Sequence, residues 1–259
     1  MYLTNPLAPD TDGDAYDDRA DPEPNAANAP IDGEYSVFTD NATGTARTAL
    51  TVTAHLENHV VYLPAASPAA PRFLYQRYLR DVNDDNAFDE GDLLASAIGI
   101  MNADGSRPRL LTDVNAQGEV EDDGAIDAVP SPSPDGAYVL FASDRGGGFQ
   151  TDLRLWVMDI DGGNPRMVAF LDGDGAPLPF QEIDADPFWG PGNRVAFKRH
   201  VLGIPSFSRL YVGDLDPVAA TVTNLTLRTD GPPRSLQGTP AGDYDPWISP
   251  DGQWIASYR

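Results

Sequence analysis

The chain contains no cysteine, only one lysine and no long apolar run. Without cysteine it cannot form disulfide bridges, thiolate zinc sites or a cysteine nucleophile. No apolar run approaches the roughly 18 residues of a membrane-spanning helix, so we expect no direct membrane span. Residues 1–25 hold six aspartates and no apolar core segment, which is unlike a signal peptide. A signal for export would therefore lie outside this sequence.

Positive charge is scarce as well. The 17 basic residues stand against 40 acidic ones, which gives a formal net charge of −23, and Lys198 is the single lysine. Binding of phosphates or anionic lipids needs a basic face, so nucleic acid and anionic membrane surfaces are excluded as partners. The acids are 33 Asp and 7 Glu, beside 24 Gly and 24 Pro. This composition favours turns and oxygen-rich cation sites over helices.

A repeat recurs along the chain. The pattern Asp-x-x-Pro-x-x-Ser-Pro-Asp-Gly spans Asp127–Gly136 and again Asp243–Gly252 without a gap. A third copy, Asp184–Gly192, is one residue shorter, and residues 64–68 form a degenerate fourth copy. Each copy leads into a short run rich in β-formers. The prolines that anchor the four copies are predicted to be Pro64, Pro130, Pro187 and Pro246.

A second motif lies between these anchors. Residues 98–112 match 155–169, and Leu210–Asp216 is a third copy, each with the signature of a β-hairpin. Together the two motifs give units of four short antiparallel strands, the pattern of a β-propeller blade. We therefore predict an all-β propeller with these blades: 64–129, 130–186, 187–245 and a partial 246–259. The alternative is a β-sandwich with coincidental turns, which the gap-free match disfavours.

These residues resemble a known family. Ser133-Pro-Asp-Gly136, followed by 139–145 and Leu155–Arg166, is similar to the blade repeat of TolB-like β-propellers over about residues 60–259. The resemblance implies a propeller fold and a tendency to bind protein partners. It implies no single chemistry, because such blades also occur as accessory domains of enzymes.

The predicted blades do not account for segment 31–63. TolB-like propellers usually have six blades, whereas this chain holds three near-complete blades and the start of a fourth. Segment 31–63 has strand character, and an open blade edge invites strand addition. Three interpretations stay open: the chain is a fragment, the segment completes the last blade in cis, or it completes a blade of a neighbouring copy.

The sharpest chemical signal precedes the blades, in residues 1–30. With Asp10 as position 1, carboxylates fall at positions 1, 3, 5, 9 and 12 and a carbonyl at position 7. This is the ligand spacing of an EF-hand-type calcium loop. With prolines on both sides, the run resembles a thrombospondin type 3 calcium repeat; the alternative is an acidic leader without metal. The predicted ligands are Asp10, Asp12, Asp14, Tyr16 through its carbonyl, Asp18 and Asp21.

A second loop with the same spacing lies inside the first blade, at residues 81–92. It resembles dockerin and other EF-hand-like loops, and the alternative is an acidic hairpin loop without metal. A cage made only of protein oxygens suits Ca²⁺ better than Mg²⁺. The predicted ligands are Asp81, Asn83, Asp85, Ala87 through its carbonyl, Asp89 and Asp92.

Other residues give weaker signals. Asp172-Gly-Asp174 is typical of a plain turn, and the repeated Asp127, Asp184 and Asp243 are predicted to brace turns within their blades. The four tryptophans are expected in the blade core. His55 and His59 lack the glutamate spacing of a zinc protease, and there is no nucleophile elbow or phosphate loop. We therefore predict no enzymatic activity.

The sequence thus predicts an extracytoplasmic, calcium-stabilised propeller module with a structural or protein-binding role. Its location is the periplasm, the cell surface or the exterior, where weak Asp-rich calcium sites can fill. The expected partners are proteins, including further copies of the chain. Two alternatives stay open: a subunit of a surface layer or fibre assembled by strand complementation, and an accessory propeller domain of a larger hydrolase.

Overall fold

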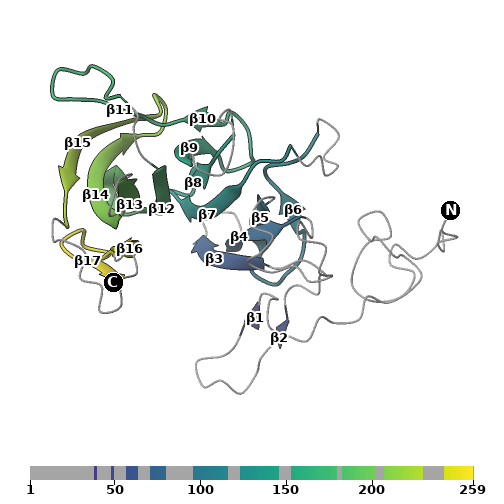
Figure 1. Ribbon diagram of the computed structural model, residues 1–259. Helices are drawn as coiled ribbons and strands as arrows, with labels where there is room; N and C mark the ends of the chain where they lie inside the picture. Colours follow the sequence, from purple (N-terminus) through teal and green to yellow (C-terminus); the bar gives the residue numbers. More distant parts are fainter. Residues whose placement is uncertain are drawn as a thin grey trace, which may run out of the picture.

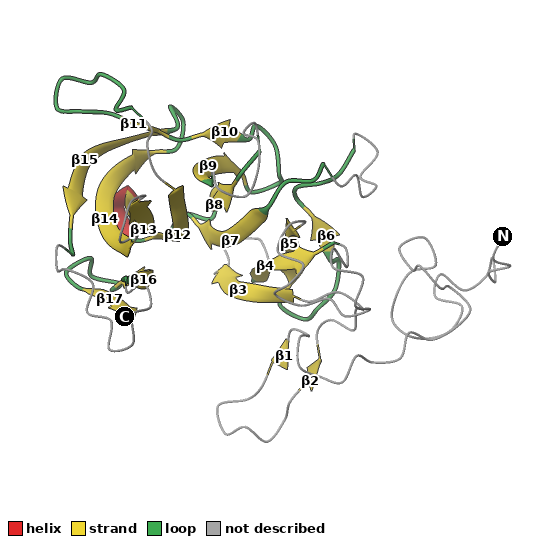
Figure 2. Ribbon diagram, viewed as in Figure 1, coloured by secondary structure: helices red, strands yellow, loops and turns green. Residues whose placement is uncertain are grey.

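The fold is almost entirely β-sheet, as the computed structural model shows (Figures 1 and 2). Its single helical element in the described ranges is the 3-10 turn η2 (Pro191–Asn193). No helix in these ranges is long and apolar enough to cross a membrane. The structure describes residues 38–39, 48–49, 57–63, 71–79, 96–115, 123–145, 153–179, 183–201, 207–229 and 242–258.

Three four-stranded antiparallel sheets follow one another along the chain. The first contains β3 (Glu57–Leu63), β4 (Arg72–Tyr78), β5 (Ser96–Asn102) and β6 (Arg109–Leu110). The second contains β7 (Asp127–Pro132), β8 (Tyr138–Ser143), β9 (Arg154–Asp159) and β10 (Arg166–Met167). The third contains β12 (Ile183–Trp189), β13 (Arg194–Val201), β14 (Phe207–Asp216) and β15 (Thr221–Leu227), with β11 (Ala169–Phe170) added in parallel.

Two smaller sheets complete the described residues. The fourth sheet pairs β16 (Tyr244–Ile248) with β17 (Ile255–Tyr258), and a separate hairpin pairs β1 (Phe38–Thr39) with β2 (Thr48–Ala49). Apart from β11, which pairs with the last strand of the third sheet, each larger sheet orders its strands as they occur in the sequence. This is the blade arrangement expected from the two motifs. The prediction of an all-β propeller is therefore confirmed.

All four blades share an irregularity in their first strand. The register shifts once in β3, β7, β12 and β16, which marks a β-bulge. One residue in each bulge has a positive φ: His59 (46°), Val129 (52°), Asp186 (50°) and Asp245 (45°). The following residue is Pro130, Pro187 or Pro246, but Val60 in the first blade.

The predicted anchor of the first blade is therefore corrected from Pro64 to Val60. The bulge defines the equivalent position, and Val60 follows the positive-φ residue as the three prolines do. Valine in place of proline hides the repeat from a sequence comparison. As a consequence β3 is the first strand of the first sheet. Among the described strands of segment 31–63, β1 and β2 lie outside that sheet.

The predicted Ser-Pro-Asp-Gly turn joins the first and second strands in two blades. In the second blade, Ser133 Oγ donates to Asp135 Oδ1 at 2.5 Å and accepts from the Tyr138 amide at 2.9 Å. Ser249 and Asp251 repeat these contacts in the fourth blade. Gly136 has a φ of +71°, a conformation that glycine adopts without strain. The hydrogen bond from Ser133 Oγ, together with one from the Ala137 amide, lowers the pKa of Asp135, whose Oδ1 accepts both.

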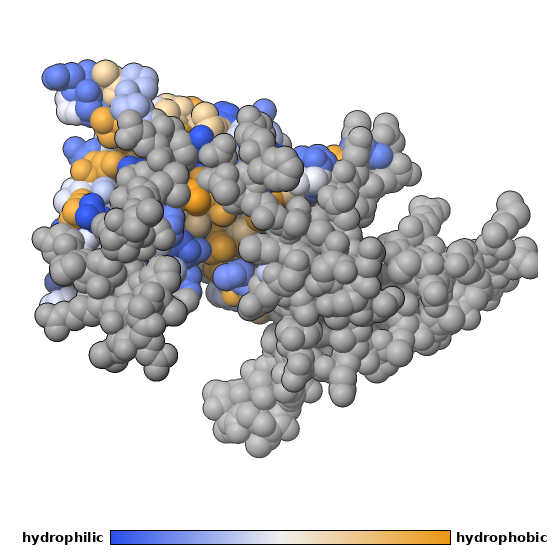
Figure 3. Space-filling model, in the orientation of Figure 1, coloured by the Kyte–Doolittle hydropathy of each residue, from blue (hydrophilic) through white to orange (hydrophobic). Residues whose placement is uncertain are grey.

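The core consists of layers between successive sheets. Because side chains alternate along a strand, Val139 and Phe141 of β8 pack on the first sheet, while Leu140 packs on the third. Ile248 of β16 packs on Ala196 and Val212 of the third sheet. Burial of each large apolar side chain contributes about 1.5–3 kcal/mol. Figure 3 shows apolar residues, in orange, gathered in the middle of the described part.

Candidate functional site

The two predicted calcium loops, 10–21 and 81–92, lie outside the described residues. Their twelve ligands therefore stay a prediction. Within the described ranges, no group of three or more histidine, aspartate or glutamate side chains is placed to hold a metal ion. Asp172 forms the plain turn expected of it, because its Oδ1 accepts from the amides of Asp174 (2.9 Å) and Ala176 (2.8 Å).

Buried aspartate–arginine pairs mark the start of the first strand in two blades. Asp184 accepts from Arg199 at two atoms, Nε to Oδ1 at 2.6 Å and Nη2 to Oδ2 at 2.8 Å. Asp127 pairs with Arg145 in the same way, and both aspartates are fully buried. These aspartates therefore tie the first strand of the blade to its second strand or the residues just after it, instead of bracing turns as the sequence suggested.

Aromatic rings enclose these guanidinium groups. The Arg199 Cζ lies 4.7 Å from the ring centre of Phe170, 5.3 Å from that of Phe197 and 5.0 Å from that of Tyr211. Such cation–π contacts strengthen when water is excluded. In the first sheet, the backbone register places Glu57 opposite Arg77.

A second acidic group lies between the first two sheets. Asp113 is 6% exposed, and its Oδ1 accepts from the Asp123 amide at 3.3 Å. Its Oδ2 is buried and has no hydrogen-bond partner among the described residues. Burial, together with the charges of Asp127 and Asp123, raises the pKa of Asp113 to about 8. Sequence analysis missed this group because nothing in the Leu-Thr-Asp-Val segment signals burial.

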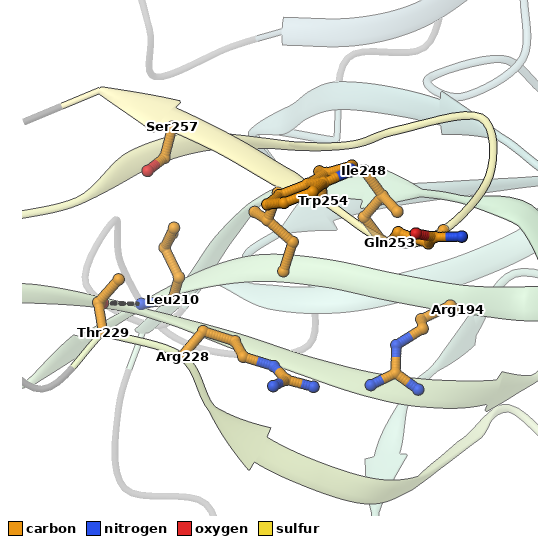
Figure 4. A pocket seen from close by; sticks show the side chains of 10 residues that line it. Arg194, Leu210, Arg228, Thr229, Ile248, Gln253, Trp254 and Ser257 are labelled. Carbon is orange, nitrogen blue, oxygen red and sulfur yellow. Dashed lines mark hydrogen bonds between the residues drawn. The ribbon is translucent and has the colours of Figure 1, made fainter.

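A pocket of about 450 Å³ lies between the third and fourth sheets (Figure 4). The guanidinium groups of Arg194 and Arg228 lie along one side, and Trp254 and Ile248 along the other. Arg194 Nη1 lies 3.2 Å from Asp214 Oδ1, at the pocket margin. The residues that line the pocket include Arg194, Leu210, Arg228, Ile248, Trp254 and Ser257. The pocket joins two cations to an apolar wall in a chain of net charge −23.

Exposed tryptophans mark the same end of the molecule. Trp254 is 72% exposed and Trp247 is 47% exposed, whereas Trp189 of the third sheet is only 4% exposed. The expectation that all four tryptophans lie in the blade core is therefore wrong for Trp247 and Trp254. Their fourth sheet has no following sheet within the described residues to cover them.

Comparison with known proteins supports the fold. No family model matches the chain. Over 94 residues, or 36% of its length, the chain is 34% identical to the Tol-Pal system protein TolB of Rhizorhabdus wittichii, and the match spans 16% of that relative. The structure is similar to TolB from Agrobacterium tumefaciens, with a TM-score of 0.52 and 18% identity, over 89% of this chain and 69% of that one. The TolB-like β-propeller fold is thus confirmed.

Proposed function

We propose that the chain is an extracytoplasmic, calcium-binding β-propeller module that binds protein partners and carries out no catalysis. The observation that carries this proposal is the likeness of its blades, in fold and in sequence, to the Tol-Pal system protein TolB. The buried aspartate–arginine pairs support it, because they brace two of the blades as a rigid platform for loops and exposed faces. Rigid scaffolds of this kind commonly carry binding surfaces on their loops.

Calcium is the second part of the proposal. The five side chains predicted as ligands in each of 10–21 and 81–92 repel one another or stay unsatisfied unless a cation joins them. Ions that bind the folded state alone stabilise it by about 2.7 kcal/mol at a concentration of one hundred times Kd. We therefore expect excess chelator to lower the Tm by roughly 5–10 °C, at about 2–4 °C for each kcal/mol.

Thermal unfolding of three variants in calcium and in chelator tests this expectation. The double variants Asp12→Asn/Asp14→Asn and Asp85→Asn/Asp89→Asn each lose part of the calcium effect. The matched control Asp174→Asn, in the plain turn, keeps all of it. Titration calorimetry should then count one ion fewer in each double variant. Identical melting curves of the wild-type chain in calcium and chelator would contradict the calcium sites.

The partner-binding role needs a separate measurement. Purified proteins of the Rhizorhabdus wittichii Tol-Pal system can be titrated against the chain in calcium. A saturable binding heat with one of them supports the role proposed from the TolB likeness. Absence of binding to every one of them, by a chain shown to be folded, contradicts that role and leaves the calcium result standing.

A further inference from the structure

Two crossovers that join successive sheets begin in the same way. The first crossover leads from β6 to β7, and the second leads from β10 to β12. The Leu111 amide of the first bonds to the third strand of its own sheet at 2.7 Å, and the Val168 amide of the second does so at 2.8 Å. Two residues later the first crossover has Asp113 and the second has Phe170. These side chains occupy corresponding positions of the repeat, and both are more than nine-tenths buried.

Both side chains lie near the buried aspartate–arginine pair of the next blade. Phe170 covers the pair of the third sheet, since the Arg199 Cζ lies 4.7 Å from the centre of its ring. Asp113 lies within electrostatic reach of Asp127, the acid of the pair in the second sheet. An aromatic ring beside a guanidinium group is favourable, whereas a second charged carboxylate near a buried aspartate is unfavourable.

The charged groups around Asp113 are mostly acidic. Burial raises the pKa of Asp113, and the charges of Asp127 and Asp123 raise it further. Arg145 is the cation of this cluster, and it already donates to both carboxylate oxygens of Asp127. Asp144, next to Arg145, accepts from a backbone amide of the first crossover at 2.7 Å. A charge on Asp113 would therefore add to an excess of negative charge.

The two side-chain oxygens of Asp113 differ in what they contact. Oδ1 accepts from the Asp123 amide at 3.3 Å, which ties the end of the first crossover to its beginning. Oδ2 is buried and has no hydrogen-bond partner in the part of the chain that the structure describes. A buried oxygen without a donor costs much less on a neutral carboxylic acid than on a carboxylate. The closed crossover therefore favours the protonated form of Asp113.

We propose that Asp113 is a proton-controlled latch, which holds residues 111–113 and 123–126 together in acid and releases them as the pH rises towards 8. In the open crossover Asp113 meets water and titrates near its ordinary pKa of 3.8, whereas in the closed one burial raises this pKa to about 8. The equilibrium constant for opening thus rises by about tenfold for each pH unit between these values and levels off above them. Phe170 does not titrate, so the second crossover has no such dependence.

Hydrogen exchange of the wild-type chain in calcium, at pH 5, 6, 7 and 8, tests the latch. The Asp123 and Ile126 amides report on the first crossover, because both donate to side-chain carboxylates in the closed state. We expect their protection factors to fall by up to about tenfold for each pH unit. The Val168 and Leu171 amides of the second crossover, which donate to backbone carbonyls, are the internal control and keep their protection.

A variant separates the latch from other effects of pH. Asparagine does not titrate and tolerates the positive φ of position 113, so Asp113→Asn should make the protection of the first crossover independent of pH. Its protection should match that of the wild type at pH 5. The matched control Asp174→Asn removes a carboxylate from an exposed turn and leaves the pH dependence of the wild type unchanged.

Three outcomes overturn the proposal. Constant protection of the first crossover from pH 5 to pH 8 means that its closed state does not hold the proton. An equal loss of protection in both crossovers means that pH acts on the whole molecule. A pH dependence that persists in Asp113→Asn belongs to another group. The wild-type measurement decides the first two outcomes even if the variant does not fold, and no result bears on calcium binding or on a Tol-Pal partner.

Discussion

Two interfaces of the molecule are built from the same repeat but differ in how much they bury. One lies between the second and third sheets, and the other lies between the third and fourth sheets. In the former, Trp189 is buried, and Arg166 donates to a carbonyl of the next blade. In the latter, Trp254 is exposed, and Arg228 lies in a pocket. The difference teaches that two strands of a blade suffice to bury the inner part of an interface, as Ile248 shows, while the outer part depends on the third and fourth strands.

The largest expected effect contrasts two ion pairs of the third sheet, one buried and one beside the pocket. Asp184→Ala leaves the Arg199 guanidinium buried without its partner, so we expect a loss of about 3–5 kcal/mol in the free energy of unfolding. Asp214→Ala breaks a pair at the pocket in which both side chains are more than 30% exposed, and we expect about 1 kcal/mol or less. Urea unfolding measures both. Equal losses would show that burial does not distinguish the two ion pairs.

A smaller effect is expected where two blades approach most closely. A Cβ on Gly162 would lie 2.5 Å from the Leu111 carbonyl oxygen, and Gly162 has a φ of +93°. Gly162→Ala should therefore cost about 1–3 kcal/mol from strain and a forced shift of the first sheet. Gly175→Ala is the matched control, because its φ is +80° with no atom within 4 Å of the added carbon. A Gly175 variant as unstable as the Gly162 variant would mean that the close approach contributes nothing.

The smallest effect depends on pH and concerns the first interface. The folded chain keeps the Asp113 proton up to a pKa of about 8, whereas the unfolded chain releases it near the model value of 3.8. Stability from this group is therefore present below about pH 4 and is lost as the pH rises towards 8. Asp113→Asn removes this pH-dependent loss of folding stability, because asparagine does not titrate. Asparagine also tolerates the positive φ of this position.

We expect the Tm of Asp113→Asn to exceed that of the wild type by a few degrees at pH 8.5, and to match it near pH 4. Calorimetry at both pH values measures the difference between the two chains, which cancels the titration of other groups. A difference that does not change with pH would show that Asp113 titrates as an exposed carboxylate does.

Sequence reasoning located the turns and missed the contacts between blades. The Ser133 and Ser249 turns follow from local hydrogen bonds, so the sequence alone predicted them. Arg109 donates to the Asp161 carbonyl of the next blade and Arg166 to the Val218 carbonyl of the blade after it. Each bond joins residues 52 positions apart, and only the Pro-Arg step in the second motif hinted at them. By register, Ile248 corresponds to Trp189, and both are buried, whereas Trp247 corresponds to Phe188 on the opposite face of the strand. The burial of that face depends on a following sheet, which a single blade sequence does not reveal.

The prolines of the bulges restrict which edge of their sheets can pair with a further strand. Pro130, Pro187 and Pro246 lie on the first strand, at the edge that no other strand of the sheet covers, and a proline offers no amide to a new strand. The outer edge of β17, Ile255–Tyr258, contains no proline. The prolines thus disfavour pairing with a further strand at the first-strand edge, whereas the outer edge of β17 keeps its backbone amides. The first sheet has Val60 in place of the proline, so its first-strand edge keeps the backbone amide that proline removes in the other three sheets.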